Sequence, residues 1–227
     1  MSPRGDGGAT NRRRNEAARR NGSARSKRFL QRQQEIIDKS AHVFAERGFH
    51  GTSTIELCEA NDIGKGALYY YIGSKERLLV SIHDRVMDEV MAGADRVAAA
   101  GGSATEQLGM LGSELLNVIA RYPDHVWVFL HDFPALTGEN ARQFRARRRE
   151  YERRVEAVFV AGMESGEFRE LDPKLATRAW LGMHNYTYLW LKAGGRLSAN
   201  QVARSFADIF VSGISSLSSR VPVSGVG

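Results

Sequence analysis

The side chains best suited to binding chemistry lie in one stretch of the sequence, between Thr52 and Lys75. This stretch combines hydroxyl groups, lysines and adjacent tyrosines with small glycine and alanine residues. Ammonium and hydroxyl groups hold phosphate oxygens, and small residues let a backbone approach a duplex closely. The residue types therefore indicate binding to a polyanion such as DNA. The residues predicted to contact DNA are Thr52, Ser53, Gly64, Lys65, Gly66, Ala67, Tyr69, Tyr70 and Lys75.

Residue patterns typical of catalysis or metal binding are missing from the sequence. It contains neither a G-x-S-x-G nor an H-E-x-x-H motif, and Gly64-Lys65 lacks the upstream glycine of a P-loop. The six histidines are scattered, and none stands at zinc-ligand spacing with Cys58, the single cysteine. We therefore predict that the protein is not an enzyme and has no catalytic residue, no metal and no cofactor.

The basic charge of the protein is concentrated at its N-terminus. The 227 residues have a formal net charge of +6, and residues 1–28 contain nine basic side chains against two acidic ones. This segment has almost no large apolar side chains, so it cannot bury enough surface to fold alone. We expect a disordered basic arm over residues 1–28. The arm either follows DNA phosphates, which is the interpretation we favour, or only keeps the protein soluble.

Apolar residues at helical spacing follow the arm. They predict a helix from Phe29 to Gly48, a very short helix with an apolar stripe at Ile55 and Leu57, and another short helix over 65–71. Two short helices joined by a tight turn are the minimum for a helix-turn-helix, whose second helix enters the major groove. The sequence therefore predicts a helix-turn-helix DNA-binding domain over residues 29–79.

Helix caps can be recognised at several points further along the chain. Ser74 can cap a fourth helix, and Ser198 with Gln201 resembles a capping box. Asp172 stands before a proline at the first position of a helix that should run on to the Gly194-Gly195 pair. These signals predict further helices, each ended by glycine or proline.

The fold class expected from these patterns is all-α, because no alternating strand pattern is evident. A C-terminal helical domain for effector binding and dimerisation is predicted over residues 80–220. A disordered tail is expected over 221–227. No apolar run approaches the roughly 18–20 residues that a membrane span needs, so we expect no membrane partner and a cytoplasmic, nucleoid-associated location.

The stretch from residue 29 to 79 resembles the DNA-binding signature of the tetracycline-repressor (TetR) family. The matching residues are Gly51 to Ser53, Ile55 to Ala60, Ile63 to Tyr71 and Ser74 to Leu79. The resemblance implies a homodimeric transcriptional repressor that binds a palindromic double-stranded DNA operator and is released by a small molecule. It also supports phosphate contacts by Tyr70 and Lys75.

Three positions depart from the pattern of that family. Asp62 replaces the usual glycine of the turn, and it tolerates the left-handed backbone conformation at a modest cost. Gly64 replaces the usual hydroxyl cap, and Tyr71-Ile72 replaces a histidine-phenylalanine pair. The base preference at these positions is therefore open.

The C-terminal segment is similar to family members that control fatty-acid or steroid breakdown. Trp190, the run Gly194 to Ser198 and the helix over 206–214 carry this similarity. It implies a hydrophobic small-molecule effector, fatty acyl or steroid-derived, that could arrive as a coenzyme A thioester. Candidate polar anchors are His131, His184 and Asn185. The residues predicted to bind the effector are Met87, Met91, Trp127, Leu130, His131, Phe133, Phe159, Met163, Met183, His184, Tyr186 and Trp190.

Wide apolar stripes with small residues on the last two helices indicate a dimer interface. The residues predicted to form it are Ala179, Gly182, Phe206, Phe210 and Gly213. The arginines of residues 142–154 point around most of a helix, so we interpret them as a solvated face and keep a phosphate site as the alternative. Two other functions stay open: a multidrug-sensing repressor of an efflux pump and an architectural nucleoid protein.

Overall fold

The structure is a computed structural model that describes the backbone of residues 7–215 and the side chains of residues 26–215. The start of the predicted arm, residues 1–6, and the predicted tail over 221–227 lie outside the described residues. Within the described range the chain forms helices and turns, apart from one isolated bridge between Phe168 and Ser215, which confirms the all-α class. Across the same range no helix is long and apolar enough to cross a membrane.

The chain divides into two compact units between Leu78 and Leu79. Helix α4 begins before this division and continues beyond it. The helices of the described region are α1 (Gly7–Arg47), α2 (Thr54–Asn61), α3 (Lys65–Ile72), α4 (Lys75–Ala100), α5 (Ala104–Arg121), α6 (Pro123–His131), α7 (Gly138–Glu164), α8 (Pro173–Asn185) and α9 (Ala199–Ile214), with the 3₁₀ turns η1 (Phe133–Ala135) and η2 (Tyr186–Leu189).

The first unit packs α2 and α3 against the C-terminal half of α1. Ile36 and Phe44 of α1 are fully buried, as are Leu57 of α2 and Leu68 of α3. Their burial follows from the helical spacing of apolar residues, which places one stripe of each helix toward the others. This small core fixes the orientation of α3.

Polar side chains of α1 hold the C-terminal ends of α2 and α3. Arg32 donates a hydrogen bond to the carbonyl of Asn61 at 3.2 Å, and Gln33 donates one to the carbonyl of Tyr71 at 2.7 Å. The last carbonyls of a helix have no partner within the helix, so these bonds satisfy groups that would otherwise be exposed to water. They also fix the two short helices to the long one.

Helix α1 begins much earlier than the sequence predicted. Its backbone is helical from Gly7, where the composition predicted a disordered arm up to residue 28 and a helix start at Phe29. Arginine and alanine are good helix formers, and adding residues to an existing helix costs far less than starting a new one. The packed part of α1 therefore supplies the nucleus from which the helix extends toward the N-terminus.

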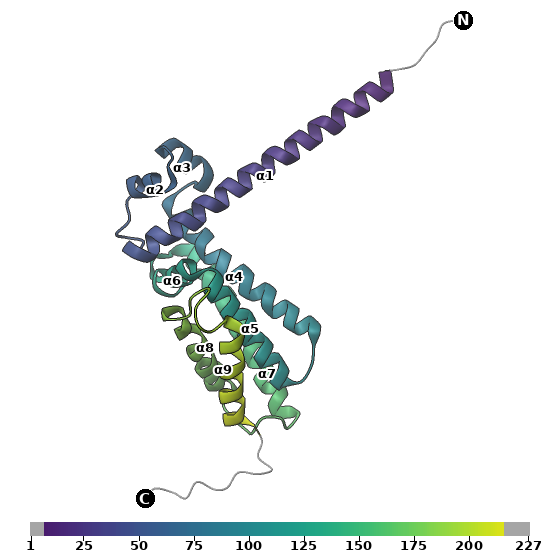
Figure 1. Cartoon of the computed structure of the whole chain (residues 1–227), viewed down its shortest axis with the longest axis vertical. Helices are drawn as coiled ribbons and strands as arrows, with labels where there is room; N and C mark the ends of the chain where they lie inside the picture. The colour runs from purple at the N-terminus through teal and green to yellow at the C-terminus, as the bar shows by residue number, and fades with distance from the viewer. Residues whose placement is uncertain (1–6, 216–227) are drawn as a thin grey trace, which may run out of the picture. The chain divides into compact units, whose positions relative to one another are not determined.

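Helix α5 is the central element of the second unit. Helices α7, α8 and α9 pack against it, and α7 also packs against α8 (Figure 1). Leu108 and Leu116 of α5, Phe159 of α7 and Trp180 of α8 are almost completely buried. The core of the second unit thus lies among α5, α7 and α8.

Helix α8 ends earlier than expected. The sequence predicted a helix up to the Gly194-Gly195 pair, but α8 ends at Asn185 and gives way to η2. The buried hydroxyl of Thr187 donates to the carbonyl of His184 at 2.7 Å. A hydroxyl that takes a helix carbonyl in this way competes with continued α-helix, which explains the early end.

The predicted caps are confirmed. The Asp172 side chain accepts hydrogen bonds from the backbone N–H groups of Lys174 and Leu175, and Ser74 accepts one from Arg77. Ser198 with Gln201 forms a capping box at the start of α9. These caps are local, so sequence reasoning could identify them.

Candidate nucleic-acid interface and ligand cavity

The turn between α2 and α3 has the geometry that a helix-turn-helix needs. Asp62 ends α2 in the left-handed region, with φ 53° and ψ 49°, as the sequence predicted. Gly64 is the N-cap of α3 and supplies no side-chain hydrogen bond to it. The first backbone N–H groups of α3 are therefore free of a side-chain cap and suited to an anion.

The outer face of α3 consists of the residues that were predicted to contact DNA. Lys65, Gly66 and Ala67 are exposed, and Tyr70 is 67% exposed, whereas Leu68 is buried. A Cβ atom built on Gly66 meets nothing within 4 Å. This face is thus small at its start and aromatic near its end, with open space in front of it.

Tyr69 has partners inside the same unit. Its hydroxyl lies 3.4 Å from the Thr54 hydroxyl, and the Lys65 ammonium lies 6.0 Å from its ring centroid. The ring is 36% exposed. Tyr69 therefore connects α3 with α2 while keeping one edge in solvent.

Thr52 was predicted to contact DNA, but its side chain is buried. Its hydroxyl donates a hydrogen bond to the Gly48 carbonyl at 2.9 Å. Ser53 is exposed, but its hydroxyl already accepts a hydrogen bond from the Glu56 backbone N–H as the N-cap of α2. The Lys75 ammonium lies 4.4 Å above the Phe49 ring, a cation–π contact that holds it at the start of α4.

Sequence reasoning missed two residues of this surface. Ile55 was assigned to the apolar stripe of α2 with Leu57, yet it is 70% exposed. Residues two apart lie about 200° apart around a helix, so both cannot face the core. Phe29 packs against Tyr70 and Tyr71, with ring centroids 5.4 and 5.1 Å away. An exposed isoleucine suits thymine methyl groups, and Phe29 positions the tyrosines.

A cavity of about 50 Å³ lies inside the second unit, among α4, α5, α6, α7 and α8. Most of its wall is aliphatic or aromatic, and the polar side chains come from α7 and α8. The lining residues are Val86, Met87, Val90, Leu115, Val118, Ile119, Val126, Phe129, Leu130, Arg148, Tyr151, Glu152, Leu181 and Asn185. An apolar wall with a few polar anchors is typical of a site for a hydrophobic small molecule.

Only some of the predicted effector-binding residues line this cavity. Met87 and Leu130 do, and so does the candidate anchor Asn185. Phe133, Tyr186 and Trp190 are 40%, 63% and 45% exposed. A hydrophobic pattern does not distinguish the wall of a cavity from the rest of a core or from an exposed apolar face.

The other predicted effector-binding residues pack elsewhere in the second unit. Phe159 and His184 are buried outside the lining, Met163 accepts a hydrogen bond from the Leu171 N–H, and the Trp127 and His131 rings stack on each other. Met91 and Met183 are half-buried and do not line the cavity either.

The two charged side chains of the cavity wall form an ion pair with each other. Arg148 and Glu152 form an ion pair at 3.8 Å within α7. Burial raises the pKa of the Tyr151 phenol, and the nearby Glu114 carboxylate raises it further, so the phenol stays protonated. The lining therefore offers one cation, one anion and a neutral hydroxyl donor around an apolar space.

Models of one family match both units of the chain. A model of bacterial regulatory proteins of the tetR family matches residues 36–82, and a model of the tetracyclin repressor-like C-terminal domain matches residues 101–214. The chain belongs to the TetR family. The first match covers the helix-turn-helix described above, and the second covers α5 to α9. The TetR family comprises regulatory proteins rather than enzymes.

Relatives within the TetR family include repressors and a metabolic regulator. The chain is 25% identical over 192 residues to the HTH-type transcriptional repressor KstR2 of Rhodococcus jostii, covering 82% of this chain and 92% of that protein. It is 23% identical over 190 residues to the fatty acid metabolism regulator protein of Bacillus subtilis, covering 79% and 94%.

One solved structure similar to this chain contains both a small molecule and DNA. The crystal structure of AibR with isovaleryl coenzyme A and operator DNA has a TM-score of 0.70 to this chain and 29% sequence identity. It covers 78% of this chain and 97% of AibR. AibR is thus a relative with the same fold that is known with both an acyl thioester and DNA.

An apolar surface lies on α8 and α9. Leu175 of α8 is 65% exposed, Tyr186 of η2 is 63% exposed, and Ile209 of α9 is 67% exposed. The predicted interface residues Ala179, Gly182 and Gly213 are exposed, and no atom lies within 4 Å of a Cβ built on either glycine. We name this surface, defined by Leu175, Ala179, Gly182, Tyr186, Ile209 and Gly213, the α8–α9 face.

Phe206 and Phe210, which were also predicted to lie at the interface, contact rings of their own chain. The Phe206 ring lies 5.4 Å from the His184 ring, and the Phe210 ring lies 5.9 Å from the Phe159 ring. Both side chains are half-buried and pack within the chain. Sequence reasoning placed them at the interface because large apolar residues on a wide stripe can face either side.

Proposed function

We propose that this TetR-family protein is a repressor that binds a palindromic operator as a homodimer and leaves it when a hydrophobic acyl compound occupies the cavity. The observation that supports DNA binding best is the exposed outer face of α3, which is free of a side-chain cap at its N-terminus. One such short helix makes few contacts, and two-fold pairing doubles them. TetR-family regulators bind operator DNA as dimers, in agreement with this proposal.

The lining of the cavity supports this class of effector. Its wall is mainly valine, leucine and isoleucine, with Arg148, Tyr151 and Asn185 as possible partners for a carbonyl or carboxylate. The names of the fatty acid regulator and of the AibR complex with isovaleryl coenzyme A support an acyl compound. Binding needs only to favour a conformation with poor operator affinity for release to follow.

The DNA-binding part is tested by selecting bound sequences from a random duplex library. We expect a palindrome with half-sites at least about one helical turn apart. Tyr70→Ala should weaken binding to every sequence by about tenfold, as loss of a phosphate contact does. Gly66→Ala has room for its methyl group and should change the preferred bases instead. Equal loss on all sequences for both variants would contradict this division of roles.

A multidrug sensor is the second candidate, because the Glu152 carboxylate in the cavity wall could pair with a cationic drug. A displacement panel separates the two functions. It contains isovaleryl, octanoyl and palmitoyl coenzyme A, the three free acids, the steroid acid cholate and the cation ethidium. The acyl proposal expects release of the selected operator by acyl compounds. Release by ethidium alone would replace it with the drug-sensor function.

A further inference from the structure

The arginines of α7 divide into two sets according to the helix that they face. Arg147 and Arg154 reach α4, where Arg147 pairs with Asp84 at 2.8 Å and with Asp88 at 2.5 Å, and Arg154 pairs with Asp95. These ion pairs are solvent-exposed, so they agree with a solvated face and add links from it to α4. On this side of the helix every arginine has a carboxylate partner from another helix.

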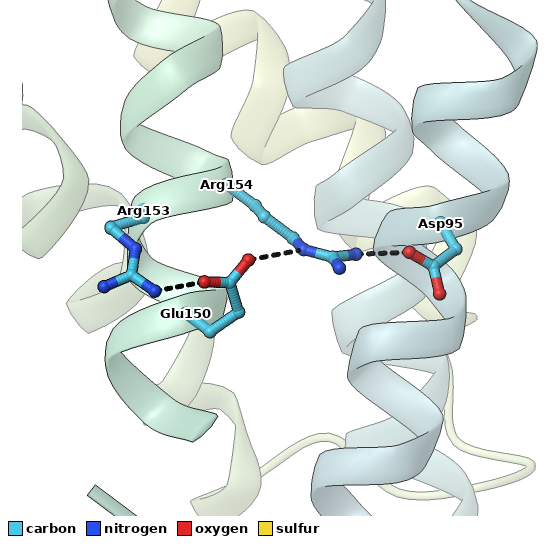
Figure 2. Close-up of polar contacts among 4 residues, drawn as sticks. All are labelled: Asp95, Glu150, Arg153 and Arg154. Carbon is cyan, nitrogen blue, oxygen red and sulfur yellow. Dashed lines mark hydrogen bonds and ion pairs between the residues drawn. The ribbon is translucent and has the colours of Figure 1, made fainter. Parts of the chain in front are cut away.

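The second set of arginines faces away from α4, and Figure 2 shows one of them, Arg153, beside Arg154 of the first set. Arg154 extends to Asp95 on α4, whereas the neighbouring Arg153 extends to the opposite side of α7, and Glu150 lies between the two guanidinium groups. Arg153 therefore has its only acidic partner in its own helix among the residues that the structure describes.

A groove of about 410 Å³ runs between α7 and α8 on the side to which Arg153 points. Its cations are Arg149, Arg153, Lys174 and Arg178, and its carboxylates are Glu152 and Glu156, so the lining has a net charge of +2. In the described part of the chain no carboxylate forms an ion pair with Arg149, Lys174 or Arg178. Helix α8 thus contributes cations beside α7, whereas α4 contributes carboxylates to the other side of α7.

The groove adjoins the effector cavity. Glu152 lines both, and Arg148 in the cavity wall directly precedes Arg149 in the groove wall. Because Arg148 pairs with Glu152, the carboxylate at the junction is already neutralised. A ligand with an apolar end in the cavity would therefore place its other end among Arg149, Lys174 and Arg178, with the Glu156 carboxylate also in the groove lining.

We infer that this groove binds the phosphate groups of an effector whose acyl end occupies the cavity. Guanidinium groups bind phosphate oxygens through paired charge-assisted hydrogen bonds, and a concave lining can hold a polyphosphate from several sides. The inference rests on the proposed function and deepens it, because it distinguishes a phosphorylated thioester from the free acid as the effector. The four cations supply affinity, and the cavity supplies selectivity for the acyl group.

The test compares a groove variant with a matched control. Arg149→Gln/Arg178→Gln removes two unpaired groove cations, and Arg142→Gln/Arg145→Gln removes two exposed arginines of α7 that lie outside the groove. Calorimetry measures the affinity of each protein for the thioester and the free acid of the acyl chain that best releases the operator in the panel above. Coenzyme A alone and ATP are measured in the same way.

We expect the native protein to bind the thioester at least tenfold more tightly than the acid. The groove variant should lose at least tenfold in thioester affinity and keep its affinity for the acid within about twofold, and the control should keep both. A groove variant that behaves like the control would overturn the inference, as would ATP or coenzyme A binding as tightly as the thioester. If no acyl compound releases the operator from the native protein, the proposed function fails instead.

Discussion

Two buried histidines illustrate what single side chains contribute to this fold. His83 and His184 are 2% and 1% exposed, and burial lowers the pKa of each to about 4. The ring Nδ1 of His83 bonds to the Leu79 carbonyl and that of His184 to the Trp180 carbonyl, both within one helical turn. Neutral imidazoles in these places act as packing groups rather than as cations for an acidic effector.

These histidines predict a loss of stability in mild acid. Above pH 6.5 the histidines are neutral in both states, so their contribution does not change. Between pH 6.5 and 4 only the unfolded chain takes up the protons, so the free energy of unfolding falls as the pH falls. At pH 5 each histidine should lower the free energy of unfolding by about 2 kcal/mol.

Denaturant unfolding at pH 7 and pH 5 measures this effect. His83→Gln and His184→Gln should each reduce the difference between the two pH values by about 2 kcal/mol. Hydrogen bonds lower the pKa of carboxyl groups such as Glu76 and Glu167, so in the folded protein these groups stay largely ionised between pH 7 and pH 5. If both variants kept the full difference in the free energy of unfolding between pH 7 and pH 5, the buried histidines would not be its cause.

At the scale of elements, the sequence predicted what depends on near neighbours. The left-handed turn at Asp62 and the caps at Asp172 and Ser198 are set by a few adjacent residues, and all three were predicted correctly. Most of the cavity wall was not predicted, because it joins residues from five helices. Arg148 and Glu152 looked like ordinary charges of an exposed helix, and only the packing of α7 against its neighbours places them at the cavity.

The start of α2 offers a test that separates folding from DNA binding. Ser53 caps α2, and Glu56 completes the capping box by accepting from the Ser53 backbone N–H at 2.7 Å. Ser53→Ala should destabilise the first unit by about 1 kcal/mol, because the cap is lost. Ser53→Asp keeps a good cap, yet its negative charge beside the predicted operator should weaken DNA binding.

Urea unfolding and operator binding, measured on both variants, give the comparison. Ser198→Ala, at the equivalent capping box of α9, is the control for loss of a cap outside the DNA-binding unit. If Ser53→Asp bound the operator as well as the native protein does, Ser53 would lie away from the phosphates.

At the scale of the whole molecule, the α8–α9 face is the surface best suited to a second copy of the chain. Leucine, tyrosine and isoleucine side chains stand exposed there beside small residues. Large exposed apolar residues that lie on neighbouring helices often mark an interface with another protein chain. Because Phe206 and Phe210 pack inward, the exposed residues of the face are the better probes of dimerisation.

Ile209→Glu should therefore convert the protein to a monomer without unfolding it. The substituted residue is 67% exposed, so the charge enters no core, whereas in a dimer it would be buried without a partner. Light scattering measures the mass, circular dichroism the helix content, and operator binding should fall with dimerisation. Arg204→Glu, exposed elsewhere on α9, is the control. A dimeric Ile209→Glu protein would place the interface on another surface.

The small size of the cavity sets the speed of any response. A space of about 50 Å³ holds no more than a handful of water molecules, so an acyl chain fits only after α4, α7 and their neighbours separate. Uptake would then be limited by how often the walls open, and the rate of operator release would reach a plateau as the effector becomes abundant. Above that concentration, more effector would not make the protein leave the operator any faster.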